Sequence, residues 1–205
     1  MKRSATHDQI KEILLERILN GTYQPGERLI ELQLAQELNT SQAPVREALR
    51  YLEAMKAVET EPYKGTRVRI ISDRELAESS QVRAVLEQFA GELAAANLKG
   101  DVKQLQSEAR KFMAAAKKRD FAEYSRHDIE FHRLIVKASG NDLLLSIWES
   151  VVLETRFRKT LAKIGEDQLI TFGNAHLPVI DSLEIGDGKT AGAVLKGLIC
   201  KFHSV

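Results

Sequence analysis

Two short amphipathic segments separated by a tight turn constrain the fold of this chain more than any other feature. Segments 31–38 and 42–54 each carry apolar residues at helical spacing, and only residues 39–41 separate them. Ser41 is a suitable N-cap, and Pro44 falls in the first turn of the second segment, where a missing backbone N–H costs little. The pattern predicts two helices joined by a turn, after an earlier amphipathic helix that ends near Asn20.

A small basic hairpin is predicted directly after these helices. The short β-like runs 58–60 and 67–71 flank a polar tip at residues 62–65. Helix, turn, helix and hairpin in this order define a winged helix-turn-helix, in which the second helix of the pair enters the DNA major groove by its N-terminal end. The candidate DNA-binding residues are Ser41, Gln42, Ala43, Arg46 and Arg50 on the helix and Lys64, Gly65, Thr66 and Arg67 on the hairpin.

The prediction of DNA binding depends on the position of the charges and not on their sum. The chain has 30 basic and 29 acidic residues and a net charge of +1, which excludes a uniformly basic protein. Gln42 can read adenine through a bidentate amide contact, and Arg46 can read guanine or hold a phosphate. The alternative interpretation is a small α/β domain with a solvated charged face.

After Ser72 the sequence changes to longer helical segments. Residues 73–202 are rich in Ala, Leu, Glu and Lys, and segments of about 20 residues show helical periodicity. The breaks between them fall near Gly100, Gly140, Gly165 and Gly186. We therefore predict a mainly α protein, with a winged helix-turn-helix domain over residues 1–72 and an all-α helical bundle over residues 73–205.

The cysteine content and the hydropathy pattern bear on the compartment. Cys200 is the single cysteine and cannot form an internal disulfide, which favours a reducing compartment. No apolar run reaches the roughly 18–20 residues of a membrane helix, and the N-terminus lacks the apolar stretch of a signal peptide. We expect a cytoplasmic protein that does not associate with a membrane.

Polar residues interrupt the apolar stripes of two predicted bundle helices. Asp128 and His132 lie one helical turn apart, and His176 lies in a stripe with Leu169 and Ile180. A buried carboxylate must be paired, neutralised or bound to a cation. One oxygen and two nitrogen donors suit a divalent zinc, nickel, manganese or iron ion with open coordination positions. The alternative for Asp128 and His132 is a buried hydrogen-bonded pair.

A metal held in this way can also activate water, so a metal-dependent hydrolytic enzyme is the competing function. The chain contains no HExxH, GxSxG, P-loop or GxGxxG motif. We therefore expect no enzyme. A purely structural dimerisation module with an empty core is a third hypothesis.

Two further residues are candidates for binding an effector. Arg83 can bind a carboxylate ligand bidentately, or it can pair only with Glu87, four residues on. Asn141 can donate to a ligand, but the order Gly140-Asn141-Asp142 also indicates a helix stop followed by an N-cap. We favour the cap for Asn141.

Residues 20–68 resemble the DNA-binding domain of GntR-type transcriptional regulators. The resemblance lies in the segments NGTYQPGERL (20–29), LAQEL (34–38), SQAPVREAL (41–49) and PYKGTRV (62–68). Members of this family usually have Arg at the position of Gln42 and often Thr at the position of Ala43. We therefore expect a base preference that differs from that of a typical member.

The remaining two thirds resemble the FadR-type C-terminal domain (FCD), an all-helical bundle that binds a ligand and dimerises. The matching segments are VRAVLE (82–87), DIEFH (128–132), SGN (139–141) and His176 followed ten residues later by Gly186-Asp187. The resemblance implies a homodimeric, ligand-responsive regulator that binds operator DNA. We predict a repressor whose binding to the operator is controlled by a small organic acid.

The same resemblance implies a divalent metal held by one Asp and three His in the bundle. Asp128, His132 and His176 match three of these ligands, but Leu198 stands where the fourth is expected, 22 residues after His176. His203 is a substitute candidate, although it lies near the end of the chain, where helices fray. The effector implied is a small organic acid that fills open positions on the metal.

Overall fold

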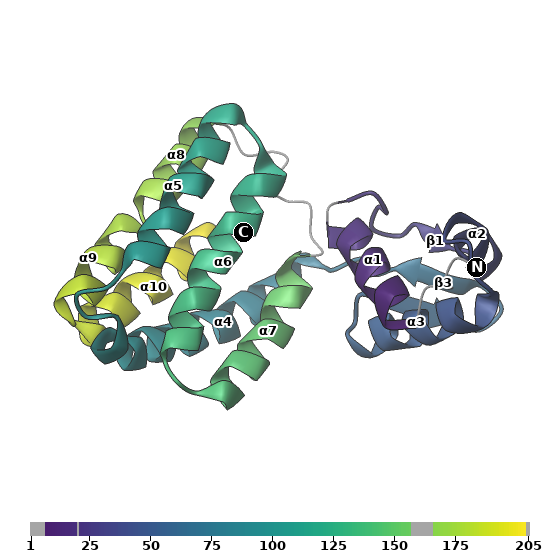
Figure 1. Cartoon of the computed structure of the whole chain (residues 1–205), viewed down its shortest axis with the longest axis horizontal. Coiled ribbons are helices and arrows are strands. Elements are labelled where there is room, and N and C mark those ends of the chain that lie inside the picture. The colour runs from purple at the N-terminus through teal and green to yellow at the C-terminus, as the bar shows by residue number, and fades with distance from the viewer. Residues whose placement is uncertain (1–6, 20, 157–165, 204–205) are drawn as a thin grey trace. The chain divides into compact units, whose positions relative to one another are not determined.

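The structure is a computed structural model of the chain and describes residues 7–19, 21–156 and 166–203; the side chains of residues 153–156, 166, 202 and 203 lie outside this description. It is mainly α-helical with one small sheet (Figure 1). The chain divides into two compact units: the first comprises residues 1–72 together with 153–159, and the second comprises residues 73–152 and 160–205.

The N-terminal unit consists of three helices and a three-stranded antiparallel sheet. In chain order the elements are α1 (His7–Leu19), β1 (Arg28–Leu29), α2 (Glu31–Glu37), α3 (Gln42–Ala54), β2 (Val58–Glu61) and β3 (Gly65–Val68). The strand order is β1-β3-β2. Ile10 and Leu14 of α1 and Val45, Leu49 and Leu52 of α3 are buried, which fixes α3 against α1 and leaves its other face to solvent.

The predicted helix-turn-helix and wing are present, but the strands of the hairpin have other ends: the first is one residue longer than predicted and the second begins and ends earlier. Val58 pairs with Val68 and Glu61 with Gly65, whereas residues 69–71 lie outside the strand. Tyr63 and Gly65 have positive φ angles of 64° and 84°, which close the turn within three residues. Strand β3 therefore begins at Gly65 and not at Arg67.

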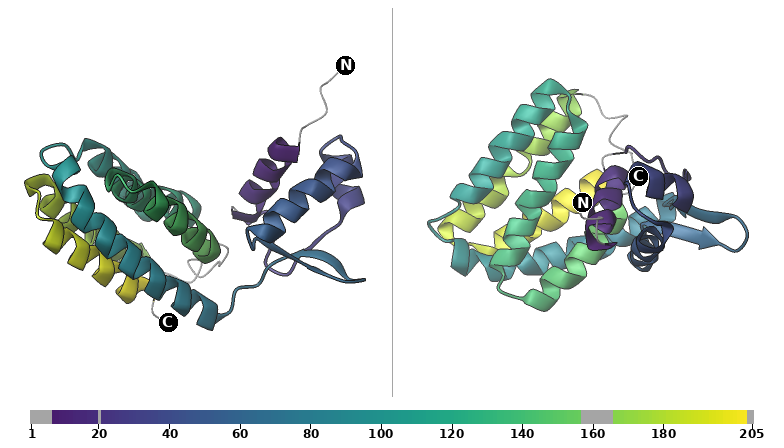
Figure 2. Two further views of the ribbon diagram at one scale, coloured as in Figure 1. Left: turned by 90° about the horizontal axis from the view of Figure 1, so that it is seen from below. Right: turned by 45° about the vertical axis from the view of Figure 1, so that its right-hand side comes forward.

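The C-terminal unit is a helical bundle (Figure 2). Its helices are α4 (Asp73–Leu98), α5 (Lys103–Lys118), α6 (Phe121–Ala138), α7 (Asp142–Arg156), α8 (Glu166–Asn174), α9 (Leu177–Ile185) and α10 (Gly188–His203). Helix α4 packs closely along α10, because Gly192 leaves room for the α4 backbone: a Cβ at that position would lie 2.5 Å from the carbonyl oxygen of Gln88. Among the described residues, no helix is long and apolar enough to cross a membrane.

The segment around His176 is broken where the apolar stripe suggests continuity. Helix α8 ends at Asn174, and α9 begins at Leu177 with Pro178 in its first turn. Proline is accommodated there because the N–H groups of a first turn have no helical partner. His176 therefore occupies the N-cap position of α9, at the junction of two helices.

Candidate functional site

Asp128, His132 and His176 converge in the interior of the helical bundle. Helix α6 supplies the first two residues at i and i+4, and the α8–α9 junction supplies the third. The Nε2 atoms of the two histidines lie 3.2 Å apart, and His176 Nε2 lies 3.2 Å from Asp128 Oδ1. Among the described residues this is the one group of acidic, histidine or cysteine side chains with the geometry of a metal site.

The outer nitrogen of each histidine lies beside an oxygen atom. His132 Nδ1 lies 2.6 Å from Glu87 Oε2, and His176 Nδ1 lies 2.9 Å from the carbonyl oxygen of Phe172. Because a carbonyl can only accept, the proton of His176 belongs on Nδ1, and its Nε2 lone pair faces the centre of the site. The contact of His132 Nδ1 with Glu87 has the distance of an ion pair but not the geometry of a hydrogen bond.

This arrangement fits a divalent metal. Ligand atoms at a metal–ligand distance of about 2.1 Å are separated by roughly 3.0–3.4 Å at octahedral or tetrahedral angles. The two separations that involve His176, both 3.2 Å, fall in that range, and all three ligand atoms lie within 4.8 Å of one another. The metal-free alternative is a His176 imidazolium that donates to both Asp128 and the Phe172 carbonyl.

The carboxylates of Glu87, which is buried, and Asp128, which is half-buried, are held in the ionised form. Burial would raise the pKa of Glu87, but the guanidinium of Arg83, the contact with His132 and the hydrogen bond from Trp148 lower it to about 2. Burial would likewise raise the pKa of Asp128, but His176, and after it His132 and Arg83, lower it well below its usual value. The bundle therefore carries fixed negative charge beside the histidines at neutral pH.

The position expected for a fourth protein ligand is apolar. Leu198 on α10 is buried within the apolar core of the bundle and offers no donor atom. The side chain of His203, the substitute candidate, lies outside the described residues. The described site therefore has three protein donors, which leaves further coordination positions for water or an effector.

Arg83 pairs with Glu87, which is the second of the two interpretations given above for this residue. Its Nε lies 2.6 Å from Glu87 Oε1, and Trp148 donates to the same oxygen over 2.7 Å. Arg83 Nη2 is buried and has no hydrogen-bond partner among the described residues. Glu87 is thus shared by Arg83, His132 and Trp148, a central role that the i, i+4 spacing to Arg83 only partly indicates.

Two buried hydroxyl groups also lack a partner within the described part of the chain. They are Ser80 Oγ, on α4 before Arg83, and Tyr124 Oη, on α6 one turn before Asp128. Sequence reasoning assigned neither residue to the site. Only their spacing in the sequence could have indicated a place near the site, because each shares a helix face with a candidate site residue.

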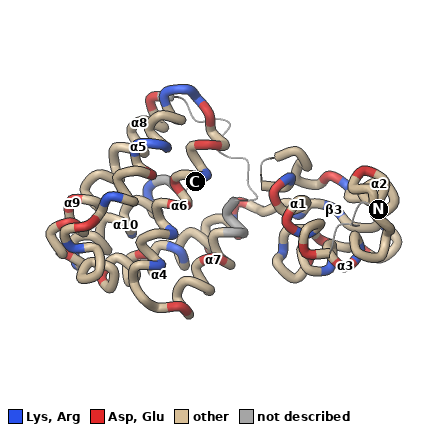
Figure 3. The backbone as a smooth tube through the Cα atoms, viewed as in Figure 1, with Lys and Arg blue, Asp and Glu red and all other residues tan. Residues whose placement is uncertain are grey.

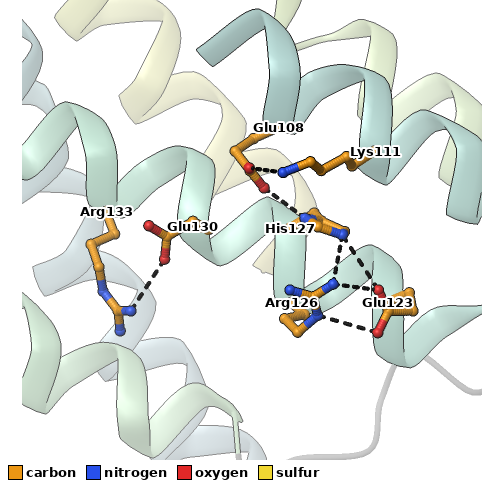
Figure 4. Close-up of polar contacts among 7 residues, drawn as sticks. All are labelled: Glu108, Lys111, Glu123, Arg126, His127, Glu130 and Arg133. Carbon is orange, nitrogen blue, oxygen red and sulfur yellow. Dashed lines mark hydrogen bonds and ion pairs between the residues drawn. The ribbon is translucent and has the colours of Figure 1, made fainter. Parts of the chain in front are cut away.

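Other candidates have contacts outside this group. The Asn141 side-chain oxygen accepts from the backbone N–H of Leu144 over 3.0 Å, which is the capping interpretation favoured above. His127 lies off the Asp128 face and pairs with Glu108 of α5 at 2.6 Å and with Glu123 at 3.3 Å (Figure 4).

The N-terminal end of α3 presents an exposed polar surface. Ser41, Gln42 and Ala43 are exposed, and Ser41 occupies the N-cap position without a capping hydrogen bond from its side chain. Arg46 is exposed and forms a two-pronged ion pair with Glu31 of α2, with an Nη2–Oε2 distance of 2.7 Å. The hydrogen bond from Arg46 lowers the pKa of Glu31.

The remaining basic residues of this surface are also paired with carboxylates. Arg50 lies 3.4 Å from Glu47. Lys64 lies 2.7 Å from Glu61, and Arg67 contacts both Glu59 and Glu61. Basic and acidic residues accordingly alternate over the N-terminal unit (Figure 3). A bound phosphate would therefore compete with exposed carboxylates for these cations.

The hairpin tip supplies the other candidate contacts. Gly65 is exposed, and Thr66 and Thr60 bring their hydroxyl oxygens within 3.0 Å across the two strands. The Arg28 guanidinium donates to the carbonyl oxygen of Lys64 and links β1 to the tip. The candidate residues of helix and wing thus lie in one unit, all exposed except Thr66 and Arg67, which are half-buried.

A winged helix-turn-helix joined to an all-α bundle is an architecture of DNA-binding transcriptional regulators. Residues 6–68 match the bacterial regulatory proteins of the gntR family, and residues 78–199 match the FCD domain. The chain belongs to the GntR family of transcriptional regulators and carries an FCD domain.

Individual relatives agree with this assignment. The chain is 30% identical over 191 residues to a probable D-xylose utilization operon transcriptional repressor of Paenarthrobacter nicotinovorans, covering 93% of this chain and 84% of the relative. It is 32% identical over 152 residues to the gluconate operon transcriptional repressor of Bacillus licheniformis, covering 74% and 62%. Escherichia coli McbR/YncC superposes with a TM-score of 0.82 at 26% identity, covering 96% and 94%.

These similarities confirm the predicted family and fold class. They also favour a regulator over an enzyme, because the family and the relatives are transcriptional regulators. The hydrolase hypothesis has no support among them.

Proposed function

We propose that this protein is a repressor that releases operator DNA when its helical domain binds a small organic acid at a divalent metal. Residues 1–72 would bind DNA and residues 73–205 would bind the effector and dimerise, in the cytoplasm. The observation that carries the proposal is the convergence of Asp128, His132 and His176, with His176 Nδ1 hydrogen-bonded to the Phe172 carbonyl and His132 Nδ1 2.6 Å from Glu87. Two relatives that are named repressors support the direction of regulation.

DNA recognition is assigned to the exposed end of α3 and to the wing. Gln42, Ala43 and Arg46 would face the base edges, with Ser41 and Arg50 at the flanking phosphates. Lys64, Gly65, Thr66 and Arg67 would contact the backbone, where the glycine allows close approach. Support comes from the exposure of both ends of this surface and from their place in one compact unit.

The metal would be held by Asp128, His132 and His176 and would supply Lewis-acid binding of an anionic ligand. Glu87 would orient His132, and the Phe172 carbonyl would orient His176. Arg83 Nη2, which has no hydrogen-bond partner in the part of the chain that the structure describes, would bind the effector carboxylate. Asn141 is assigned to capping α7 rather than to the effector.

An apolar surface of the helical domain supports a homodimer. Val82, Val85, Phe89 and Leu93 line one exposed face of α4, spaced by three or four residues. Leu143 and Ile147 are exposed on α7, which packs beside α4 through the buried Trp148. A second copy of the same chain can cover such a face by two-fold symmetry, because the face then meets itself.

DNA-binding titrations with a fragment of the gene's own locus test the proposal. We expect a salt-sensitive specific complex that weakens when a suitable organic acid is added to zinc-loaded protein. Asp128→Asn together with His132→Gln should bind the same DNA but lose the response to the acid. Phe89→Asp should convert the dimer to a monomer in light-scattering measurements. Failure to form a specific complex under any of these conditions would refute the proposal.

A further inference from the structure

Glu31 of α2 holds the guanidinium of Arg46 on the DNA-binding face of α3. Arg46 Nε lies 3.1 Å from each carboxylate oxygen of Glu31, and Arg46 Nη2 lies 2.7 Å from Oε2. An exposed ion pair contributes little to stability as a rule, but a two-pronged contact between a planar guanidinium and a carboxylate fixes the orientation of both groups. The contact therefore matters more for where Arg46 points than for the stability of the unit.

The carboxylate of Glu31 is a fixed element of the helix-turn-helix. Glu31 is the first residue of α2, and its side chain is half-buried, whereas that of Arg46 is 53% exposed. The hydrogen bond from Arg46 lowers the pKa of Glu31, so the carboxylate is ionised at neutral pH. The first helix of the pair thus supplies a charged acceptor to the exposed face of the second.

This contact occupies one edge of the guanidinium and leaves the other edge available. The protons of Nε and Nη2 that face Glu31 are used, whereas Arg46 Nη1 has no hydrogen-bond partner within the described ranges. Nη1 and the second proton of Nη2 form another pair of parallel donors. Arg46 lies one helical turn after the exposed Gln42, so both polar side chains belong to the same face of α3.

The charge of Glu31 restricts what this edge can bind. A phosphate and a guanine each accept two parallel hydrogen bonds from a guanidinium. A phosphate on the second edge would share one positive charge with the Glu31 carboxylate, and the two anions would repel each other. Guanine O6 and N7 belong to an uncharged base, whereas adenine presents a donor beside N7. Arg50 adds no net charge here, because it pairs with Glu47 at 3.4 Å.

We propose that Glu31 is a positioning residue for DNA recognition, which holds Arg46 by its Nε–Nη2 edge so that the Nη1–Nη2 edge reads one guanine of the operator. This inference rests on the proposed function, because it requires the exposed face of α3 to bind operator DNA. A two-pronged contact of this kind should favour guanine over another base at that position by about tenfold or more.

The test is the selection of binding sites from a pool of randomised DNA duplexes by the full-length protein and its variants. Wild-type protein should select a site with a guanine that Arg46→Ala no longer requires, while the other positions of the site are kept. Glu31→Gln removes the charge, and Glu31→Asp keeps the charge but shortens the side chain. Both Glu31 variants should lose most of the preference for the same guanine, because neither keeps the two-pronged contact.

A matched control separates positioning from a general effect of charge. Glu47→Gln removes an exposed carboxylate that pairs with Arg50 on the same helix, so it changes the charge of this surface as Glu31→Gln does. It should strengthen binding to all duplexes alike and keep the guanine preference. A wild-type preference in Glu31→Asp would mean that the charge alone is sufficient, and would overturn the positioning role.

A double variant tests whether Glu31 acts through Arg46. Once Arg46→Ala has removed the guanine preference, adding Glu31→Gln should change the relative binding of the four bases at that position no further. A further change of similar size would overturn the inference.

The remaining outcomes distinguish the inference from the proposed function. A selected site whose base preferences are the same in wild type and in Glu31→Gln would overturn the role of Glu31, and the regulator function would stand. Selection of no common sequence by wild-type protein would refute operator recognition and the inference with it. Because the variants alter residues that are not buried, preferences kept at the other positions of the site show that the unit is folded.

Discussion

Glu87→Gln is expected to destabilise the helical domain strongly. Glu87 is 1% exposed, and its two oxygens contact Arg83 Nε at 2.6 Å, His132 Nδ1 at 2.6 Å and Trp148 Nε1 at 2.7 Å. Glutamine keeps the volume but removes the charge and turns an N–H₂ group toward groups that themselves donate. Removing one partner of a buried ion pair costs about 3–5 kcal/mol.

The expected change in melting temperature is large. For a domain of this size each kcal/mol corresponds to a few degrees, so we expect a decrease of about 10–20 °C. Trp148 is the only tryptophan of the chain and contacts Glu87, so its fluorescence reports unfolding of the helical domain alone. The measurement is a thermal scan of metal-free protein at neutral pH.

Two variants make this result interpretable. Glu78→Gln removes an exposed carboxylate that pairs with Arg74 on the same helix, and should leave the transition unchanged. Arg83→Met combined with Glu87→Leu should recover part of the lost stability, because it removes the charge that Glu87→Gln leaves unpaired. A Glu87→Gln protein that melts within about 1 °C of wild type would refute this account of the buried network.

Four further predictions concern the pH dependence of stability, the metal site and the DNA-binding surface. Acidification should destabilise the helical domain as the pH falls from about 4.5 toward 2, because the pKa of Glu87 is lower in the folded than in the unfolded chain. The stability that this group contributes is present above that pH window and is lost within it. Unfolding followed by Trp148 fluorescence should therefore depend less on pH in Glu87→Gln. Leu198→His should tighten zinc binding by restoring a fourth donor, whereas Leu195→His on the same helix should not, as equilibrium dialysis against a competing chelator would show. If Arg46 holds a phosphate, Arg46→Ala should reduce the slope of log K against log salt concentration by about one unit. Relaxed discrimination at one base pair with an unchanged slope would instead assign Arg46 to a base. Gln42→Arg should change the preferred operator.

Local sequence patterns were sufficient for the architecture. Helix α3 has the predicted bounds, because its apolar spacing, its N-cap position and the proline in its first turn are all encoded within a few residues. The wing was predicted with less accurate strand ends, because the positive φ angle of Tyr63 has no reliable local signal. The family assignment also came from short motifs at fixed spacing and is confirmed by both domain matches.

The candidate site was only partly visible in the sequence. The i, i+4 pair of Asp128 and His132 can be read from one helix, and His176 was proposed from its place in an apolar stripe. The helix break that puts His176 at an N-cap became apparent only in the folded chain.

Tertiary structure alone decided which groups share protons and charge. Glu87 and His132 are far apart in sequence, as are Glu87 and Trp148, yet each pair is in contact. The unpartnered state of Tyr124 likewise depends on every helix packed around it. Periodicity states which face of a helix is buried, but hydrogen bonds and ion pairs form over about 3 Å, and only the packing of one helix against another sets distances that short.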